Sequence, residues 1–188
     1  ISVSAFLLNR SSDLEIVKKI HRGSLRDYFI DQSNGKFVLD FDVVGPYKLL
    51  QPYSYYGKDS ENGNHDVNAI QMIIQAIGMA VSEVDYKDYD WDGDNEVEQV
   101  YIIYAGEGQS SGGGADTVWP HKSSISDWSL SGYKPMSING ITIDTYACSN
   151  EMNGNKTAGI GTICHEFSHC LGYPDMYDVR HNSGETNT

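Results

Sequence analysis

One short segment constrains this 188-residue chain more than any other. It reads His165-Glu-Phe-Ser-His-Cys-Leu-Gly-Tyr-Pro-Asp175 and begins inside a predicted helix of residues 158–171. Two histidines four positions apart project from one helix face about one turn apart, so both imidazoles can reach one metal ion. Gly172 can adopt the left-handed conformation that ends a helix, and Pro174 prevents the helix from resuming. The chain therefore turns sharply and can return Asp175 to the same ion.

This ligand set is typical of catalytic zinc, which takes imidazole nitrogens and carboxylate oxygens and keeps one position open. Glu166 lies beside the histidines, where its carboxylate can meet a water at the metal and act as the general base. The opposite face of the helix is apolar and should be buried, and it consists of Ile160, Ile163, Cys164, Phe167, Cys170 and Leu171. The sequence therefore predicts zinc ligands at His165, His169 and Asp175.

Hydrophobic periodicity divides the rest of the chain into helices and strands. Helices are predicted over residues 14–29, from a capping box of Ser12 and Glu15, and over residues 66–84. Strands are predicted over residues 37–43 (ending at Gly45-Pro46), 97–105, 117–121 (a short edge strand), 136–138 and 141–146, the last two flanking Asn139-Gly140. The order strand, helix, strand favours a right-handed crossover between parallel strands. We therefore predict an α/β fold with a mixed, mostly parallel twisted sheet and packed helices.

A second cluster of ligand-type side chains lies at residues 88–98, where carboxylates occupy every second position. The first three match the first half of a calcium loop, but the twelfth position is Gln99 rather than a bidentate glutamate. A shorter loop is equally compatible, with the ligands Asp90, Asp92, Asp94 and Glu98. Hard oxygens suit Ca²⁺ better than Zn²⁺, and without a cation these charges would repel. We predict a structural calcium site, with a solvated acidic turn as the alternative.

Composition excludes several classes of protein. The 26 Asp and Glu residues outnumber 13 Lys and Arg, and a formal net charge of −13 repels phosphate backbones, so we expect no nucleic-acid partner. No apolar run approaches the ~20 residues that a membrane span requires. The Gly112-Gly113-Gly114 run lacks the Lys-Ser/Thr of a phosphate-binding loop. Cys164 and Cys170 cannot pair along one helix, so Cys148 either bridges to one of them or all three are free thiols.

Other single residues carry less information. His121 could lie near a cleft if residues 117–121 hold the substrate, but we favour a packed or exposed histidine. Glu151 and Asp178 are candidates to accept a hydrogen bond from a zinc-bound imidazole, and Tyr173 could supply a hydrogen bond to the transition state. No role is assigned to His21, His65 and His181.

The segment from His165 to Asp178 resembles the immune inhibitor A family of bacterial secreted metallopeptidases. Weaker likenesses follow in the same order along residues 24–178: Ser24-Leu-Arg-Asp-Tyr-Phe29, Ser33-Asn-Gly-Lys-Phe37, Val44-Gly-Pro46, Asp90-Trp-Asp-Gly-Asp94 with Val97-Glu98, Tyr104-Ala-Gly106 and Trp119-Pro-His-Lys122. The resemblance implies a zinc endopeptidase with a zincin- or metzincin-like catalytic domain. It also implies that His165, His169 and Asp175 are the zinc ligands and Glu166 the general base.

We therefore expect residues 1–188 to form part of a metallopeptidase catalytic domain, mainly its N-terminal subdomain plus the active-site helix. The first strand would be missing or cut short before Ile1. The C-terminal subdomain, which would hold the Met-containing turn and most of the pocket that selects a side chain, would be absent. The chain starts at Ile1 with neither Met nor leader, so we expect a processed piece of a longer protein.

The expected function is that of a bacterial endopeptidase, secreted or at the cell surface. It would hydrolyse proteins or peptides through a zinc-bound water and Glu166, with substrate lying along the edge strand. The spacing of Gly172 and Asp175 argues against another zinc hydrolase. The alternative from a different class is a calcium-stabilised binding or adhesion module with a vestigial metal site, against which the intact Glu166 argues. Cleavage specificity, natural substrate and oligomeric state do not follow from the sequence.

Overall fold

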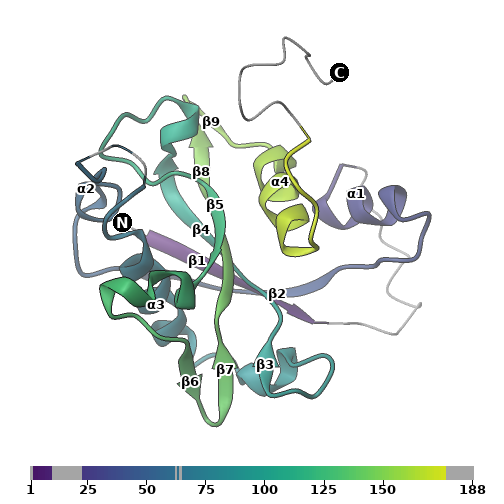
Figure 1. Cartoon of the computed structure of the whole chain (residues 1–188). Coiled ribbons are helices and arrows are strands. Elements are labelled where there is room, and N and C mark those ends of the chain that lie inside the picture. Colours follow the sequence, from purple (N-terminus) through teal and green to yellow (C-terminus); the bar gives the residue numbers. More distant parts are fainter. Residues whose placement is uncertain (1, 10–22, 62, 64, 177–188) are drawn as a thin grey trace.

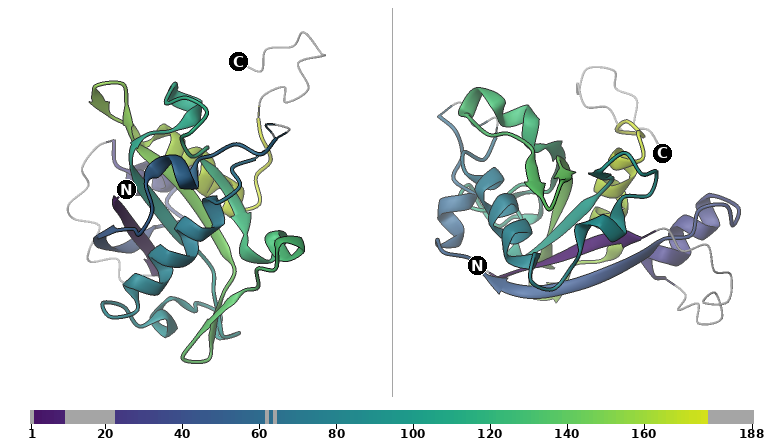
Figure 2. Two further views of the ribbon diagram at one scale, coloured as in Figure 1. Left: turned by 90° about the vertical axis from the view of Figure 1, so that its left-hand side faces the viewer. Right: turned by 90° about the horizontal axis from the view of Figure 1, so that it is seen from below.

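The computed structural model describes residues 2–9, 23–61, 63 and 65–176 (Figure 1). Its main sheet has the strand order β2-β1-β4-β8-β5, with β9 pairing at the end of β8, and a smaller sheet has the order β3-β7-β6. Helices α1 and α4 cover one face of the main sheet and α3 covers the other (Figures 1 and 2). Two apolar clusters, one on each face, therefore hold three layers together.

The strands are β1 Ser2–Asn9, β2 Asp40–Lys48, β3 Glu96–Val97, β4 Val100–Glu107, β5 His121–Ser124, β6 Met136–Ile138, β7 Ile141–Ile143, β8 Thr145–Asn153 and β9 Lys156–Thr157. The helices are α1 Leu25–Gln32, α2 Tyr53–Tyr56, α3 Ala69–Ala80 and α4 Ile160–Cys170. Short 3-10 turns are η2 Tyr86–Tyr89, η3 Gln109–Ser111 and η4 Ile125–Ser131. Among the described residues, no helix combines the length and apolar character needed to cross a membrane.

The predicted mixed sheet is present, but the prediction that it is mostly parallel is wrong. In the described part of the main sheet only β4 and β8 pair in parallel, whereas β1 pairs antiparallel with both β2 and β4. Strands β2 and β4 do run in the same direction, as the predicted crossover requires. They are separated by β1, a strand that was not predicted from the sequence. Pairing partners so distant in sequence leave no local pattern, which explains this error.

The first predicted helix is also corrected. Helix α1 begins at Leu25, because Gly23 has a φ of +90° and Ser24 caps the helix by accepting a hydrogen bond from the Asp27 N–H at 3.1 Å. A continuous helix over residues 14–29 is therefore excluded. The predicted capping box of Ser12 and Glu15 lies outside the described residues.

Two predictions about strands need adjustment. Strand β2 runs through Gly45-Pro46, which has a cis peptide bond, so the predicted stop there is wrong. Pro46 lies at the register shift between β1 and β2, between the pairs Ala5–Val44 and Val3–Tyr47, and such an irregularity accommodates a residue without an N–H. The predicted strand at residues 117–121 is shifted, because β5 begins at His121. Its predicted position at the edge of the sheet is confirmed among the described residues. The hairpin is confirmed as well, with φ of 53° at Asn139 and 86° at Gly140 in the turn between β6 and β7.

Helix α4 is anchored to the sheet by a small aromatic cluster. Phe167 is buried and its ring lies 5.1 Å from that of Phe29 on α1 and 6.4 Å from that of Phe37. Cys164 is buried beside it, and Ile160, Ile163 and Cys170 are partly buried against the same cluster. Leu171 is 39% exposed, so its predicted burial is wrong. This packing gives the histidines that α4 carries a rigid support.

The three cysteines are free. Burial raises the pKa of the Cys164 thiol to about 11 and that of Cys170 to about 12, and it also raises the pKa of Cys148. A raised pKa favours the protonated thiol, which is a weaker nucleophile than the thiolate.

A buried carboxylate fixes the chain where it enters β5. Asp66 is 4% exposed, and its Oδ2 accepts a hydrogen bond from the Trp119 N–H at 2.8 Å, while its Oδ1 is buried without a hydrogen-bond partner. Burial is the main reason that the pKa of Asp66 rises from 3.8 to about 6, and the nearby Asp59 raises it slightly further. The hydrogen bond from the Trp119 N–H and the charge of His121 oppose this rise.

This raised pKa predicts how stability depends on pH. The Asp66 carboxyl is protonated in folded and unfolded chains below pH 4 and only in folded chains between about pH 4 and 6. The free energy of unfolding should therefore fall as pH rises through this window, by roughly 2–3 kcal/mol. We expect Asp66→Asn to unfold at higher denaturant than the wild type at pH 8 and to show no such gain at pH 3.5. Asp31→Asn, a change at an exposed site on α1, is the control. A destabilised Asp66→Asn variant at pH 8 would contradict the assignment.

Candidate metal centre

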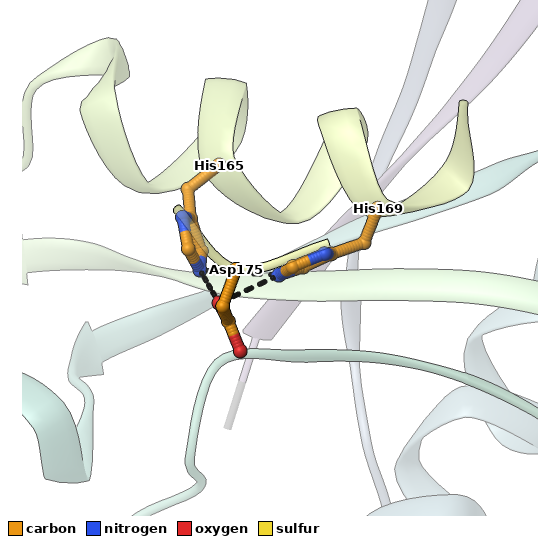
Figure 3. Close-up of side chains that lie close together, drawn as sticks. All are labelled: His165, His169 and Asp175. Carbon is orange, nitrogen blue, oxygen red and sulfur yellow. Dashed lines mark hydrogen bonds and ion pairs between the residues drawn. The ribbon is translucent and has the colours of Figure 1, made fainter. Parts of the chain in front are cut away.

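Three side chains converge beside the C-terminal half of α4 (Figure 3). Asp175 Oδ1 lies 3.3 Å from His165 Nε2 and 3.2 Å from His169 Nε2. The two Nε2 atoms are 3.2 Å apart. All three side chains are partly exposed, with 40%, 22% and 33% of the side-chain surface of His165, His169 and Asp175 open to solvent. The structure thus brings together the three residues that the sequence singled out.

The turn after α4 explains how Asp175 returns to the histidines. Gly172 has a φ of +89°, which confirms the predicted left-handed residue at the helix end. The N–H groups of Gly172 and Tyr173 donate to the carbonyls of His169 and Ser168, closing the last turn at 3.0 and 3.1 Å. The chain then reverses, and Pro174 keeps it from continuing the helix.

The same turn orients one imidazole. His169 Nδ1 lies 2.8 Å from the Tyr173 carbonyl oxygen, to which it donates its proton. In a neutral imidazole this leaves Nε2 with a free lone pair that points at Asp175. Of the two carboxylates predicted for this partnership, Glu151 is exposed and Asp178 lies outside the described residues. The hydrogen-bond partner of His169 Nδ1 is the backbone carbonyl of Tyr173, four residues further along the chain. A prediction based on side-chain types could not identify a backbone group.

This donor set fits a zinc ion. Ligands at ~2.0–2.1 Å from a tetrahedral zinc are separated from one another by about 3.3 Å, close to the three distances observed here. Two imidazole nitrogens and a carboxylate oxygen also match the ligand types that zinc prefers. The lone pairs of the two Nε2 atoms and of Asp175 Oδ1 would repel one another at these distances, and a cation between the three atoms would offset that repulsion.

Glu166 lies on the flank of α4 that faces β5, and it is 7% exposed. Burial raises the pKa of its carboxyl and Asp175 raises it further, while His121, His169 and a hydrogen bond from the Lys122 backbone N–H oppose this rise. A carboxylate with a raised pKa accepts a proton more readily than an exposed one. The position and environment of Glu166 therefore suit a general base next to the three converging side chains.

His121 is a packed histidine, one of the two environments predicted for it. Its Nδ1 lies 2.7 Å from the Trp119 carbonyl oxygen and its Nε2 3.1 Å from the Tyr146 hydroxyl. It pairs with Cys148 across β5 and β8, on the face of the sheet that α3 covers. His65 is exposed with its ring near Trp128, and His21 and His181 lie outside the described residues.

The acidic loop brings together a second group of carboxylates. Asp90, Asp92 and Glu98 each offer an oxygen within 4.8 Å of the others. Glu98 Oε1 accepts a hydrogen bond from the Trp91 N–H at 2.8 Å, whereas Oε2 is buried without a hydrogen-bond partner. Asp94 lies outside this group, and its Oδ1 accepts a hydrogen bond from the Glu96 N–H at 2.8 Å.

Comparison with known proteins gives one family and several relatives. Residues 11–188 match the family described as "Immune inhibitor A peptidase M6, catalytic domain". The chain is 25% identical over 176 residues to "Pre-pro-metalloprotease PrtV" of Vibrio cholerae serotype O1, covering 84% of this chain and 19% of that protein. It is 26% identical over 183 residues to "Immune inhibitor A" of Bacillus thuringiensis subsp. alesti, covering 83% of this chain and 26% of that protein. The chain therefore spans about a fifth to a quarter of the length of these relatives.

Proposed function

This chain belongs to the immune inhibitor A family of M6 metallopeptidases, and we propose from this membership that it is a zinc-dependent endopeptidase. The observation that carries the proposal is the convergence of His165, His169 and Asp175 within 3.3 Å beside the buried carboxyl of Glu166. Family membership identifies the chain as a metallopeptidase hydrolase, which acts on protein or peptide substrates. It gives no support to the alternative of an adhesion module.

Each residue has a separate role in the proposed reaction. His165, His169 and Asp175 would hold the zinc ion through Nε2, Nε2 and Oδ1. When bound, zinc supplies a Lewis acid that polarises the substrate carbonyl and acidifies water. Glu166 takes a proton from the attacking water and passes it to the leaving amine. Among the described residues β5 pairs only with β8, so its other edge could offer backbone hydrogen bonds to an extended substrate, which fits an endopeptidase.

We further propose that the domain acts outside a bacterial cell, as part of a larger catalytic domain. One relative carries the name "pre-pro-metalloprotease", which describes a precursor with segments to be removed. In this proposal residues 1–188 supply the N-terminal subdomain and the active-site helix, consistent with the small share of each relative that the chain covers.

The experiment that tests the function is hydrolysis of unfolded casein by the intact protein and its Glu166→Gln variant, with and without a zinc chelator. Hydrolysis that persists at full rate in the presence of the chelator would overturn the proposal. The expected results are given in the Discussion.

We also propose that the acidic loop binds Ca²⁺ through Asp90, Asp92 and Glu98. Three observations support this: the oxygens approach within 4.8 Å, Glu98 Oε2 is buried without a hydrogen-bond partner, and burial together with Asp92 raises the pKa of Glu98. A divalent cation would satisfy that oxygen and offset the repulsion. Its role would be structural, because the loop leads into β4.

The calcium proposal predicts a stability change. At a free Ca²⁺ concentration 100-fold above Kd, binding should add about 2.7 kcal/mol to the free energy of unfolding, or roughly 5–10 °C to Tm. We expect this shift to disappear in Glu98→Gln and to survive in Asp94→Asn, whose carboxylate lies outside the group. The measurement is a thermal melt in calcium-free and millimolar-calcium buffers. An unchanged Tm in the wild type counts against the site.

A further inference from the structure

The chain enters β5 between a buried carboxylate and the proposed general base. We call residues 119–122, from Trp119 to Lys122, the entry segment. At its start, Asp66 Oδ2 accepts a hydrogen bond from the Trp119 N–H at 2.8 Å. At its end, the Lys122 N–H donates a hydrogen bond to the carboxyl of Glu166 on α4, the helix that packs against β5 (Figure 1). The entry segment therefore connects Asp66, three residues before α3, with Glu166.

His121 ties the entry segment to itself and to β8. Its Nδ1 lies 2.7 Å from the Trp119 carbonyl oxygen, and because a carbonyl oxygen can only accept, Nδ1 donates the proton. Its Nε2 lies 3.1 Å from the Tyr146 hydroxyl on β8. Burial raises the pKa of Asp66 and of Glu166, and His121 opposes this rise at both, so its ring lies within electrostatic range of both carboxyls. His121 thus stands between the two ends of the connection.

Hydrogen bonds rather than side-chain packing hold Trp119 in place. Its side chain is 51% exposed, whereas its N–H is bound by Asp66 and its carbonyl by His121. The preceding residue, Val118, is buried, and its carbonyl accepts hydrogen bonds from the Tyr104 hydroxyl at 2.7 Å and the Gln109 N–H at 3.1 Å. Removing the Asp66 carboxylate therefore releases the residue that joins this fixed point to β5.

We propose that Asp66 and His121 are positioning residues for Glu166, because they hold the entry segment where the Lys122 N–H orients the carboxylate of the general base. The proposal rests on the endopeptidase function and adds two residues to its site. A base that takes a proton from water requires a defined orientation, and a displacement of about 1 Å can lower the rate about 100-fold. A backbone N–H provides this orientation without itself giving or taking a proton.

Two other roles would use the same contacts. Asp66 and His121 could serve stability alone, which would change Tm but leave kcat of the folded protein as it is. They could instead align the outer edge of β5 for the substrate, which would change KM. Neither of these roles depends on Glu166. A loss of kcat that disappears when Glu166 is replaced is therefore the signature of positioning.

The chain offers matched variants for this test. Asp66→Ala removes the acceptor of the Trp119 N–H, whereas Asp66→Asn retains an oxygen that can accept it. His121→Ala removes Nδ1, whereas His121→Asn retains an N–H donor near the position of Nδ1 and carries no charge. Asp144→Ala is the control, because Asp144 Oδ1 accepts a hydrogen bond from the Ser126 N–H at 2.8 Å and so anchors the chain just after β5.

The first measurement is casein hydrolysis by the intact protein, at a temperature where each variant is folded, with zinc analysis of the same samples. We expect Asp66→Ala and His121→Ala to lower kcat about 10- to 100-fold, with KM within about twofold of the wild type and full zinc content. Both asparagine variants should stay within about threefold of the wild-type kcat, and Asp144→Ala should match it. In the Glu166→Gln background, Asp66→Ala should change the residual kcat by less than about twofold, because no base is left to position.

Hydrogen exchange separates this proposal from the proposed function, since it requires neither zinc nor substrate. In the intact protein, Asp66→Ala should speed amide exchange at Trp119 and Lys122 by about tenfold or more, and Asp66→Asn should not. Glu166→Ala should speed exchange at Lys122 and leave Trp119 protected. Absence of chelator-sensitive hydrolysis would contradict the function, while this exchange pattern would still support the connection between the two carboxyls.

Three results overturn the positioning role. The first is wild-type kcat in Asp66→Ala, or an equal loss of kcat with and without Glu166, which assigns Asp66 to stability. The second is a raised KM with unchanged kcat, which assigns the entry segment to substrate binding. The third is unchanged exchange at Lys122 in Asp66→Ala, which shows that the entry segment does not transmit the change. If Asp66→Ala does not fold, the two His121 variants decide by the same criteria.

Discussion

Replacing Glu166 by Gln should lower kcat for casein hydrolysis by about 10²- to 10⁴-fold while one zinc ion per chain remains bound. Glutamine has nearly the same shape as glutamate and can still accept a hydrogen bond from the Lys122 N–H, but it cannot take a proton from water. Because Glu166 is 7% exposed and burial raises the pKa of its carboxyl, a neutral side chain is tolerated there. Stability should therefore be unchanged or slightly higher in the variant.

The measurement pairs initial rates with metal analysis of the same samples. Glu151→Gln is the control, since Glu151 is an exposed glutamate on β8, and its rate should match the wild type. A Glu166→Gln variant with full zinc content and wild-type kcat would remove Glu166 from the mechanism. A variant that also loses zinc would instead indicate that Glu166 is itself a zinc ligand or that the substitution disrupts the site.

Replacing Asp175 by Ala should weaken zinc binding by more than about 100-fold. Replacing a residue that only hydrogen-bonds to a metal ligand already lowers metal affinity about 10- to 100-fold, and the loss of a ligand itself should cost more. Asp175 is the proposed ligand from outside α4, and its Oδ1 lies within 3.3 Å of both imidazole Nε2 atoms. Without it, two histidines on one helix turn remain and zinc lacks its third protein ligand. Hydrolysis should fall together with zinc content, as it should when a chelator removes the metal from the wild type.

Zinc content after dialysis and titration with a zinc indicator measure this effect. The control is Asp116→Ala, a change at an exposed carboxylate between η3 and β5 that should leave one zinc bound. Added zinc should restore hydrolysis in the chelated wild type and restore little in Asp175→Ala at the same concentration. Unchanged zinc affinity in Asp175→Ala would show that another group completes the site.

Features set by neighbours in sequence were predictable. The hairpin at Asn139-Gly140 and the end of α4 at Gly172 both depend on backbone angles that only a few residue types adopt, and those residues lie at the turn itself. The same reason places His165, His169 and Asp175 together, because a helix turn and a short reversal determine where their side chains point.

Features set by distant partners were missed or misread. Strand β1 separates β2 from β4 by pairing antiparallel with both. Strand β2 continues through Pro46, which lies opposite the register shift between Val3 and Ala5 of β1. In both cases the pairing partner is distant in sequence and leaves no local pattern. The start of α1 is different, because Ser24 accepts a hydrogen bond from the Asp27 N–H only three residues away, a local capping signal that the periodicity obscured.

The sequence by itself therefore determined a helix that carries two histidines four residues apart, the bend that follows it and the acidic character of the loop before β4. Tertiary structure alone decided that Glu166 is buried against β5 and that Asp66 holds the chain at Trp119. The physical reason is range: side-chain chemistry and backbone turns act over a few residues, whereas burial and pKa depend on elements that meet only when the chain is folded.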